Sequence, residues 1–126
     1  MHNDTSLQLV IQAVSDIFEC DPSSLSSQTR LMQDLPCESI DLLEIASRLA
    51  QTARIQVNDD SLFLRSLRTR IEEYAGEESA AVIRREFPWL RLGRAEELAS
   101  SLSDPSPQVT LADLADYITW AEAKKN

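Results

Sequence analysis

The sequence predicts an all-α protein, for three reasons. Its apolar residues recur at positions i, i+3, i+4 and i+7 over several long stretches, which is the spacing of a helix with one buried face. Its five prolines fall between these stretches, where a helical fold tolerates them. Only residues 55–57 alternate as a strand would, and three residues make no sheet. A chain of 126 residues suits one domain around a single core.

The first helix is expected to start at Thr5 and to run to about Phe18. Thr5 and Gln8 have the spacing of a capping box, and the apolar face is Leu7, Val10, Ile11, Val14, Ile17 and Phe18. Residues 20–36 are rich in Ser, Asp, Pro and Gln, so they predict a long loop. Three isolated leucines are expected to pin this loop onto the core: Leu25, Leu31 and Leu35.

The second helix is predicted from about Ser39 to Ala53. Its core-facing stripe covers a sector of about 100° and consists of Leu42, Ile45, Ala46, Leu49 and Ala53. Ile40 and Leu43 lie outside that sector. This helix therefore carries two apolar residues more than its core contact explains.

The last helix is predicted to begin at Thr110, because Thr110 and Asp113 form a second capping pair. Its apolar stripe is Leu111, Leu114, Ala115 and Ile118. Lys124 and Lys125 suit the negative dipole at the carboxyl end of a helix.

Residues 60–107 predict further helices. One carries Leu64, Leu67, Ile71 and Tyr74 and stops at Gly76, and the next carries Ala80, Ile83 and Phe87 and stops at Pro88. A shorter helix is expected over 94–102, followed by a linker over 103–108. This region has one apolar cluster, made of Phe87, Trp89, Leu90 and Leu92. It is expected to pack onto the rest of the protein. The alternative is that it forms a lid over a ligand or a site for a partner.

Composition excludes several functional classes. The formal charge of −9 disfavours binding to nucleic acid or anionic membranes and favours basic partners. Two glycines cannot build phosphate-binding loops, and a single histidine, His2, removes the usual general base and metal ligand. Cys20 and Cys37 match no metal or redox spacing, which favours a reducing cytoplasm, with one disulfide as the alternative. No apolar run is long enough to insert into a membrane.

One serine stands at the start of an acidic amphipathic helix. Ser39 follows a proline-containing loop, and a phosphate on its hydroxyl would face the positive end of the helix dipole. The run Glu38-Ser39-Ile40-Asp41 resembles the Asp-Ser-Leu signature of acyl carrier proteins. Residues 21–35 are similar to the long first loop of that family, and residues 109–118 resemble its last helix. The resemblance covers roughly residues 5–60 and 108–123.

The resemblance implies a carrier rather than an enzyme. Ser39 would bear a 4'-phosphopantetheine arm, attached from coenzyme A by a phosphopantetheinyl transferase. The thiol of the arm would hold acyl groups as thioesters and deliver them to enzymes of fatty acid or other lipid metabolism. Such enzymes would dock through basic surfaces on a patch made of Glu38, Ile40, Asp41, Leu43 and Glu44. The helices would form an acyl-carrier-like bundle, and the protein would be a cytoplasmic monomer.

The chain departs from the family pattern in several places. Residues 50–54 replace what is often an acidic run that ends in an aromatic residue, and Ser47 stands where an exposed apolar residue is common. Glu38 stands where the family usually has Asp, and residues 62–107 exceed the usual connection by roughly 35 residues. We therefore expect a carrier-like unit over 1–61 and 108–126, with a helical insertion over 62–107. The insertion holds seven arginines and eight acidic residues, whereas the remainder holds 13 acidic against 5 basic. Its arginines are expected to recognise a partner or an acyl chain that an ordinary carrier does not.

Other interpretations of the same residues stay open. The chain could be a protein-interaction module with a carrier fold and no arm, in which Ser39 is an ordinary helix cap. A hydrolase or transferase using Cys37 or Ser39 as nucleophile would need a base that the sequence scarcely supplies, so Cys37 is expected to be a structural thiol. The acidic pairs outside this site, such as Glu72-Glu73 and Glu77-Glu78, are expected to lie on the surface.

Overall fold

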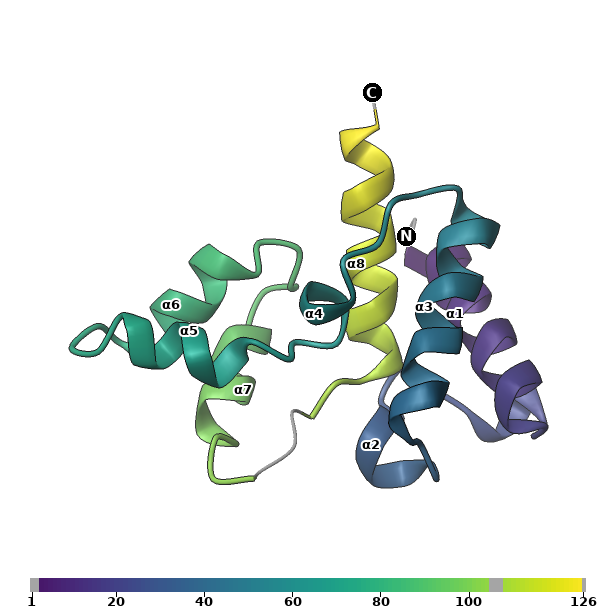
Figure 1. The fold of residues 1–126 in the computed structure, drawn as a ribbon, viewed down its shortest axis with the longest axis horizontal. Coiled ribbons are helices and arrows are strands. Elements are labelled where there is room, and N and C mark those ends of the chain that lie inside the picture. Colours follow the sequence, from purple (N-terminus) through teal and green to yellow (C-terminus); the bar gives the residue numbers. More distant parts are fainter. Residues whose placement is uncertain (1–2, 105–107, 126) are drawn as a thin grey trace.

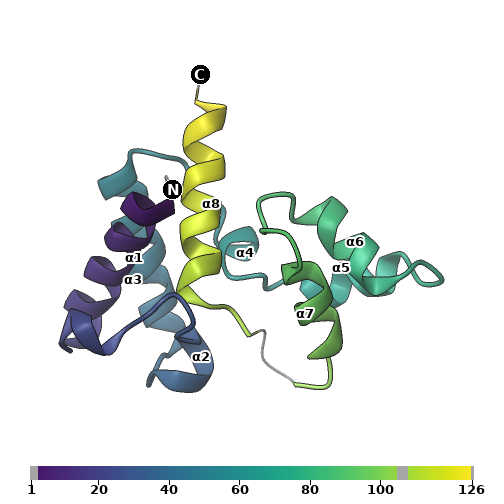
Figure 2. The same cartoon turned by 180° about the vertical axis from the view of Figure 1, so that it is seen from behind.

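Three long helices lie side by side and form the larger part of the molecule. The computed structural model describes residues 3–104 and 108–125, and within these ranges regular secondary structure is helical, beside one isolated antiparallel bridge between Arg30 and Thr110. The prediction of an all-α protein is confirmed. Helices α1 (Asn3–Phe18), α3 (Ser39–Ala53) and α8 (Leu111–Lys124) make up what we call the three-helix bundle (Figure 1). Seen from behind, α1 and α3 flank the same side of α8 (Figure 2).

The bundle core comes from the apolar stripes that the sequence predicts. Helix α3 has the predicted bounds, and its buried residues are the five predicted ones. Helix α8 starts after its cap Thr110, whose Oγ1 accepts a hydrogen bond from the Asp113 N–H at 3.2 Å, while Asp113 Oδ2 accepts one from the Thr110 N–H at 3.0 Å. The predicted capping pair at Thr110 is thus confirmed.

The loop between α1 and α3 is anchored to the start of α8. It contains a 3-10 turn, η1 (Pro22–Ser24), and one short helix, α2 (Leu31–Asp34). The Leu31 N–H donates to the Val109 carbonyl at 2.8 Å, and the Leu111 N–H donates to the Thr29 carbonyl at 3.1 Å. Of the three leucines expected to pin the loop, Leu25 and Leu31 are buried, and Leu35 is half-buried.

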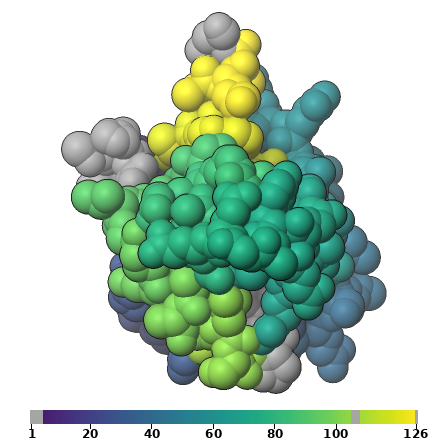
Figure 3. Space-filling view, turned by 90° about the vertical axis from the view of Figure 1, so that its left-hand side faces the viewer, coloured from purple at the N-terminus to yellow at the C-terminus, as the bar shows by residue number. Residues whose placement is uncertain are grey.

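The chain then forms a short helix, α4 (Asp59–Leu62), and three further helices that pack on one another: α5 (Leu67–Glu73), α6 (Ser79–Glu86) and α7 (Arg94–Ser100). We call the last three the α5–α7 group. They lie on the side of α8 away from α1 and α3 (Figure 1). In the space-filling view they cover that face, and the carboxyl end of α8 extends beyond them (Figure 3). No described helix is long and apolar enough to cross a bilayer.

Two helix boundaries differ from the prediction. Thr5 is not a cap, because α1 already includes Asn3. The hydroxyls of Ser6 and Thr119 lie 2.9 Å apart, so the first turn of α1 is held against α8 by a tertiary contact that periodicity does not reveal. The helix expected to include Leu64 and Tyr74 is shorter, because Leu64 has a φ of 55° between α4 and α5 and Tyr74 ends α5.

Helix α4 was not expected from the sequence. Its cap is Asn58, whose side-chain oxygen accepts a hydrogen bond from the Ser61 N–H at 3.1 Å. The backbone N–H of Asn58 donates in turn to the Tyr117 hydroxyl of α8 at 3.1 Å. The predicted helix that carries Ala80 and Ile83 is present as α6, with Phe87 as its carboxyl cap, and the helix predicted over 94–102 is present as α7 and ends at Ser100. Part of the predicted linker, residues 105–107, lies outside the described residues, as does the boundary expected at 107.

An aromatic cluster joins the segment after α6 to α8. The ring centroid of Trp89 lies 5.0 Å from those of both Tyr117 and Trp120, and 5.6 Å from that of Phe87. Phe87 and Trp89 are buried, as expected for residues that pack the segment onto the bundle. Leu92 does not take part, because it is completely exposed at the turn before α7. The predicted packing cluster therefore loses one of its four members.

Candidate functional site

Ser39 is the first residue of α3 and lies on the surface. The cap position is Glu38, with extended backbone, so Ser39 is not the ordinary cap that one interpretation assumed. Asp41 Oδ2 accepts a hydrogen bond from the Glu38 N–H at 2.8 Å. In the described part of the chain, no hydrogen bond occupies the Ser39 hydroxyl. An exposed, unengaged hydroxyl at a helix start is sterically open to modification.

Two exposed apolar side chains lie beside Ser39. Ile40 is 69% exposed and Leu43 is 56% exposed, and their i, i+3 spacing places them on one face of α3. Exposure of large apolar residues next to each other costs free energy in water unless a partner covers them. The structure therefore brings together the two surplus apolar residues as predicted from the helical projection.

Acidic side chains surround this pair. Glu38 and Glu44 are exposed and Asp41 is half-buried. Glu44 also lies 3.8 Å from Arg48, which reaches Asp16 of α1 at 3.4 Å. Part of the charge of Glu44 is thus balanced within the protein, whereas Glu38 and Asp41 have no cationic partner in the described part of the chain. We call the surface made by Ser39 and its neighbours the Ser39 patch; its members are Glu38, Ser39, Ile40, Asp41, Leu43 and Glu44.

Cys37 precedes the Ser39 patch but is not set up as a nucleophile. Burial raises the pKa of its thiol to about 11, with the negative charges of Asp41 and Glu38 adding to the effect. The thiol therefore stays protonated at neutral pH, and the thiolate is the reactive form of cysteine. Cys37 and Cys20 are both free and half-buried. This agrees with a structural thiol and with the absence of a disulfide between them.

A second polar cluster, which the sequence analysis missed, lies at the start of α8. Asp113 is 1% exposed and accepts hydrogen bonds from Arg94 Nε and Nη2 at 2.9 and 2.8 Å and from Arg91 Nη1 at 2.9 Å. Arg91 Nη1 also reaches Asp116 Oδ2 at 2.9 Å. Arg94 donates to the Gln108 carbonyl as well. Two arginines and two aspartates thus join the α5–α7 group to the bundle.

A sequence signal for this cluster existed. Arg91 and Arg94 are three positions apart, and so are Asp113 and Asp116. Equal spacings of opposite charge allow two segments to pair side by side. Nothing in the sequence says that these two segments meet, because 19 positions separate Arg94 from Asp113.

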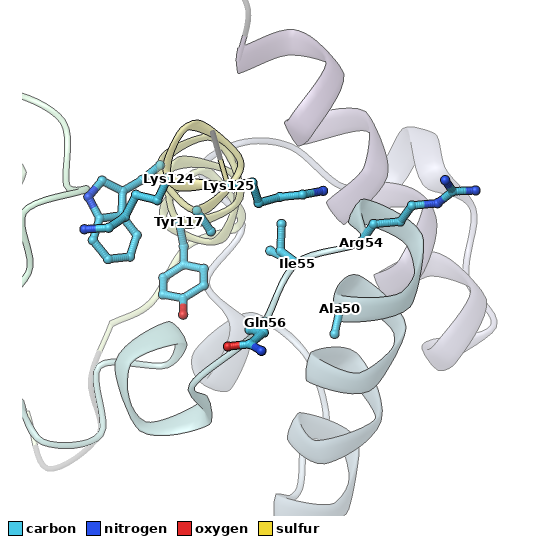
Figure 4. Close-up of a pocket in the computed structure, with 9 residues that line it drawn as sticks. Ala50, Arg54, Ile55, Gln56, Tyr117, Lys124 and Lys125 are labelled. Carbon is cyan, nitrogen blue, oxygen red and sulfur yellow. The ribbon is translucent and has the colours of Figure 1, made fainter.

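A groove lies at the other end of α3 from Ser39, between the carboxyl ends of α3 and α8. It has a volume of about 660 Å³ and is lined by Ala50, Arg54, Ile55, Gln56, Tyr117, Trp120, Ala121, Lys124 and Lys125 (Figure 4). The close-up shows Ile55 between the two helix ends, with the Lys125 side chain extending over it (Figure 4). None of these residues belongs to the site predicted from the sequence.

Comparisons of this chain with protein-family models, with curated proteins and with solved structures found no match.

Proposed function

We propose that this protein is an acyl carrier whose Ser39 bears a 4'-phosphopantetheine arm. The observation that carries the proposal is the Ser39 patch: an exposed serine hydroxyl without a hydrogen bond in the described part of the chain, at the first position of a 15-residue helix, beside two exposed apolar residues. The order of helices supports it, because a long loop separates α1 from the serine-bearing helix and α8 comes last. In this proposal the α5–α7 group belongs to an insertion in the carrier bundle.

The residues around Ser39 fit such an arm. A phosphodiester on the hydroxyl would lie at the amino end of α3, where the first-turn N–H groups and the helix dipole favour negative charge. The Ser39 side chain is exposed, so the arm would extend into solvent without displacing packed atoms. When bound, the arm supplies a thiol that holds an acyl group as a thioester. The chain's own residues position it and present a docking surface.

The Ser39 patch suits brief contacts with basic enzymes. Ile40 and Leu43 offer a small apolar contact, and Glu38 and Asp41 offer negative charge at its edge. Opposite charge at the edge of an interface raises the association rate more than the affinity. A carrier that visits several enzymes in turn needs fast association and fast release.

The test is the intact mass of the protein after incubation with coenzyme A and a promiscuous phosphopantetheinyl transferase. We expect one phosphopantetheine to be added to the wild type and to Ser47→Ala, a matched control because Ser47 is an exposed serine on the same helix. Ser39→Ala should gain no mass. The proposal fails if the wild type is not modified or if Ser39→Ala is.

A carrier fold that binds proteins without an arm is the second candidate, favoured by the exposure of Ile40 and Leu43, which does not itself require Ser39. In that case Ser39→Ala would leave the cellular role intact, and Leu43→Asp would abolish it. If Ser39→Ala alone abolishes the role, the interaction module is excluded.

A further inference from the structure

The groove between the carboxyl ends of α3 and α8 has an aliphatic strip along part of its wall. Ala50 on α3 and Ala121 on α8 are half-buried, and Ile55 between them is 8% exposed. The groove volume of about 660 Å³ falls within the range of roughly 300–1,000 Å³ typical of small-molecule sites. Ala50 is eleven residues from Ser39, which corresponds to about 16 Å along the helix. The groove is therefore spatially separate from the Ser39 patch.

Positive charge is concentrated at this groove. Arg54, Lys124 and Lys125 all line it and are exposed. In the described part of the chain, none of the three forms an ion pair with a carboxylate, although seven arginines elsewhere do: Arg30, Arg48, Arg70, Arg84, Arg85, Arg91 and Arg94. A chain with a net charge of −9 thus leaves three of its few cations without a carboxylate partner, in the described residues, beside one groove.

Helix dipoles account for part of this charge but not for all of it. Each of the two helix ends carries the equivalent of about half a negative charge. The two ends together carry about one negative elementary charge, so the three cations leave an excess of about two positive elementary charges. Glu122 is the nearest acidic residue in sequence, and no ion pair joins it to Lys124 or Lys125 in the described part of the chain. The groove therefore has a net positive edge.

Besides the three cationic side chains, the polar groups that line the groove include the Gln56 amide and the Tyr117 hydroxyl. The Tyr117 hydroxyl already accepts a hydrogen bond from the Asn58 N–H at 3.1 Å. Lys124 Nζ lies 4.4 Å from the ring centroid of Trp120 and covers one face of that ring. An unbranched hydrocarbon would lose nothing polar on entering.

We propose that this groove binds a medium- or long-chain carboxylate, with the alkyl chain along Ala50, Ile55 and Ala121 and the carboxylate near Arg54 and Lys125. In the close-up the Lys125 side chain extends over Ile55, and Arg54 follows at the end of α3 with its guanidinium directed away from Ile55 (Figure 4). Binding is noncovalent and does not involve Ser39, so it goes beyond the proposed carrier function. Trp120 lines the groove and reports on its occupancy.

The test is a titration of the full chain with sodium decanoate, followed by tryptophan fluorescence and by calorimetry. We expect saturable binding of one decanoate per chain and a change in the emission of Trp120. Decylamine has the same chain length and the opposite charge, and it should bind at least about tenfold more weakly. Raising the ionic strength toward about 1 M, where the Debye length is about 3 Å, should weaken decanoate binding.

Variants locate the site. The double variant Arg54→Gln/Lys125→Gln should weaken decanoate binding about fivefold to tenfold, because two exposed charge contacts are lost. Arg65→Gln is the matched control, since Arg65 is an exposed arginine that forms no ion pair in the described residues and lies outside the groove. Ser39→Ala should bind decanoate as the wild type does, which separates this test from that of the carrier function. The proposal is overturned if binding is not saturable or if decylamine binds as tightly as decanoate. It is also overturned if Arg65→Gln weakens decanoate binding as much as Arg54→Gln/Lys125→Gln does.

Discussion

The three-helix bundle and the α5–α7 group use their charges in different ways. In the α5–α7 group and the turns that flank it, six of seven arginines are engaged within the described part of the chain. Arg70, Arg84 and Arg85 pair with glutamates of the same group. Arg68 donates to the carbonyls of Leu102 and Asp104, and Arg91 and Arg94 pair with α8. Arg65 alone has no such partner there.

The bundle, by contrast, leaves charges of both signs directed outward. Glu38 and Asp41 surround exposed apolar residues at one end of α3, and Arg54 and Lys125 lie beside a groove at the other end. Beside the acidic docking patch, the sequence alone favoured the arginine-rich segment as a second surface for recognition. The comparison teaches that clustered charge in a sequence does not show whether it faces a partner or the protein itself.

The largest predicted effect concerns the polar junction between the two regions. Asp113→Ala should lower the free energy of unfolding by about 3–5 kcal/mol, because it leaves the buried Arg94 without its buried carboxylate partner. It also removes half of the Thr110 capping box. Urea unfolding followed by circular dichroism measures this. Glu97→Ala removes an exposed partner of the same arginine and should cost about 1 kcal/mol or less. If Asp113→Ala and Glu97→Ala lower stability equally, burial does not make the Arg94–Asp113 pair more important than the Arg94–Glu97 pair.

The aromatic junction should be next. Trp89→Ala should lower the free energy of unfolding by about 3 kcal/mol, since it opens a cavity between Phe87, Tyr117 and Trp120. The buried Trp89 Nε1 has no hydrogen-bond partner in the described part of the chain, which destabilises the wild type. Removing this donor therefore offsets part of the free energy that the cavity costs. Leu92→Ala is the matched control from the same sequence cluster and should change stability by less than about 0.5 kcal/mol. A large effect of Leu92→Ala would contradict its full exposure.

The smallest effect is expected at Asp116. Burial raises the pKa of its carboxyl, the charge of Asp113 adds to this, and Arg91 opposes it. A carboxyl whose pKa is higher in the folded state contributes stability that is present at low pH and is lost as the pH rises through the folded pKa. Asp116→Asn should therefore change stability by about 1 kcal/mol or less at neutral pH. As the pH falls, the wild type should gain stability relative to Asp116→Asn, as measured by urea unfolding across pH. The opposite trend would show that Arg91 lowers the pKa of Asp116 by more than burial and Asp113 raise it.

Much of the fold could be predicted because it depends on local patterns. The bounds and buried face of α3 follow from apolar spacing, and the start of α8 follows from the Thr110–Asp113 capping pair. The exposure of Ile40 and Leu43 follows from the same projection. The start of α1 could not be predicted, because the contact between Ser6 and Thr119 joins residues 113 positions apart. Helix α4 was missed because four residues contain too little periodicity.

By itself, then, the sequence determined the helical class, the long helices and the residues of the Ser39 patch, all of which depend on neighbours within a turn or two of helix. Only the tertiary structure decided which arginines are engaged, which of the apolar cluster is buried and that cations from α3 and α8 meet at one groove. The physical reason is that ion pairing and burial depend on which distant segments come within a few ångströms of each other. That proximity is set by the packing of whole helices, and no local spacing encodes it.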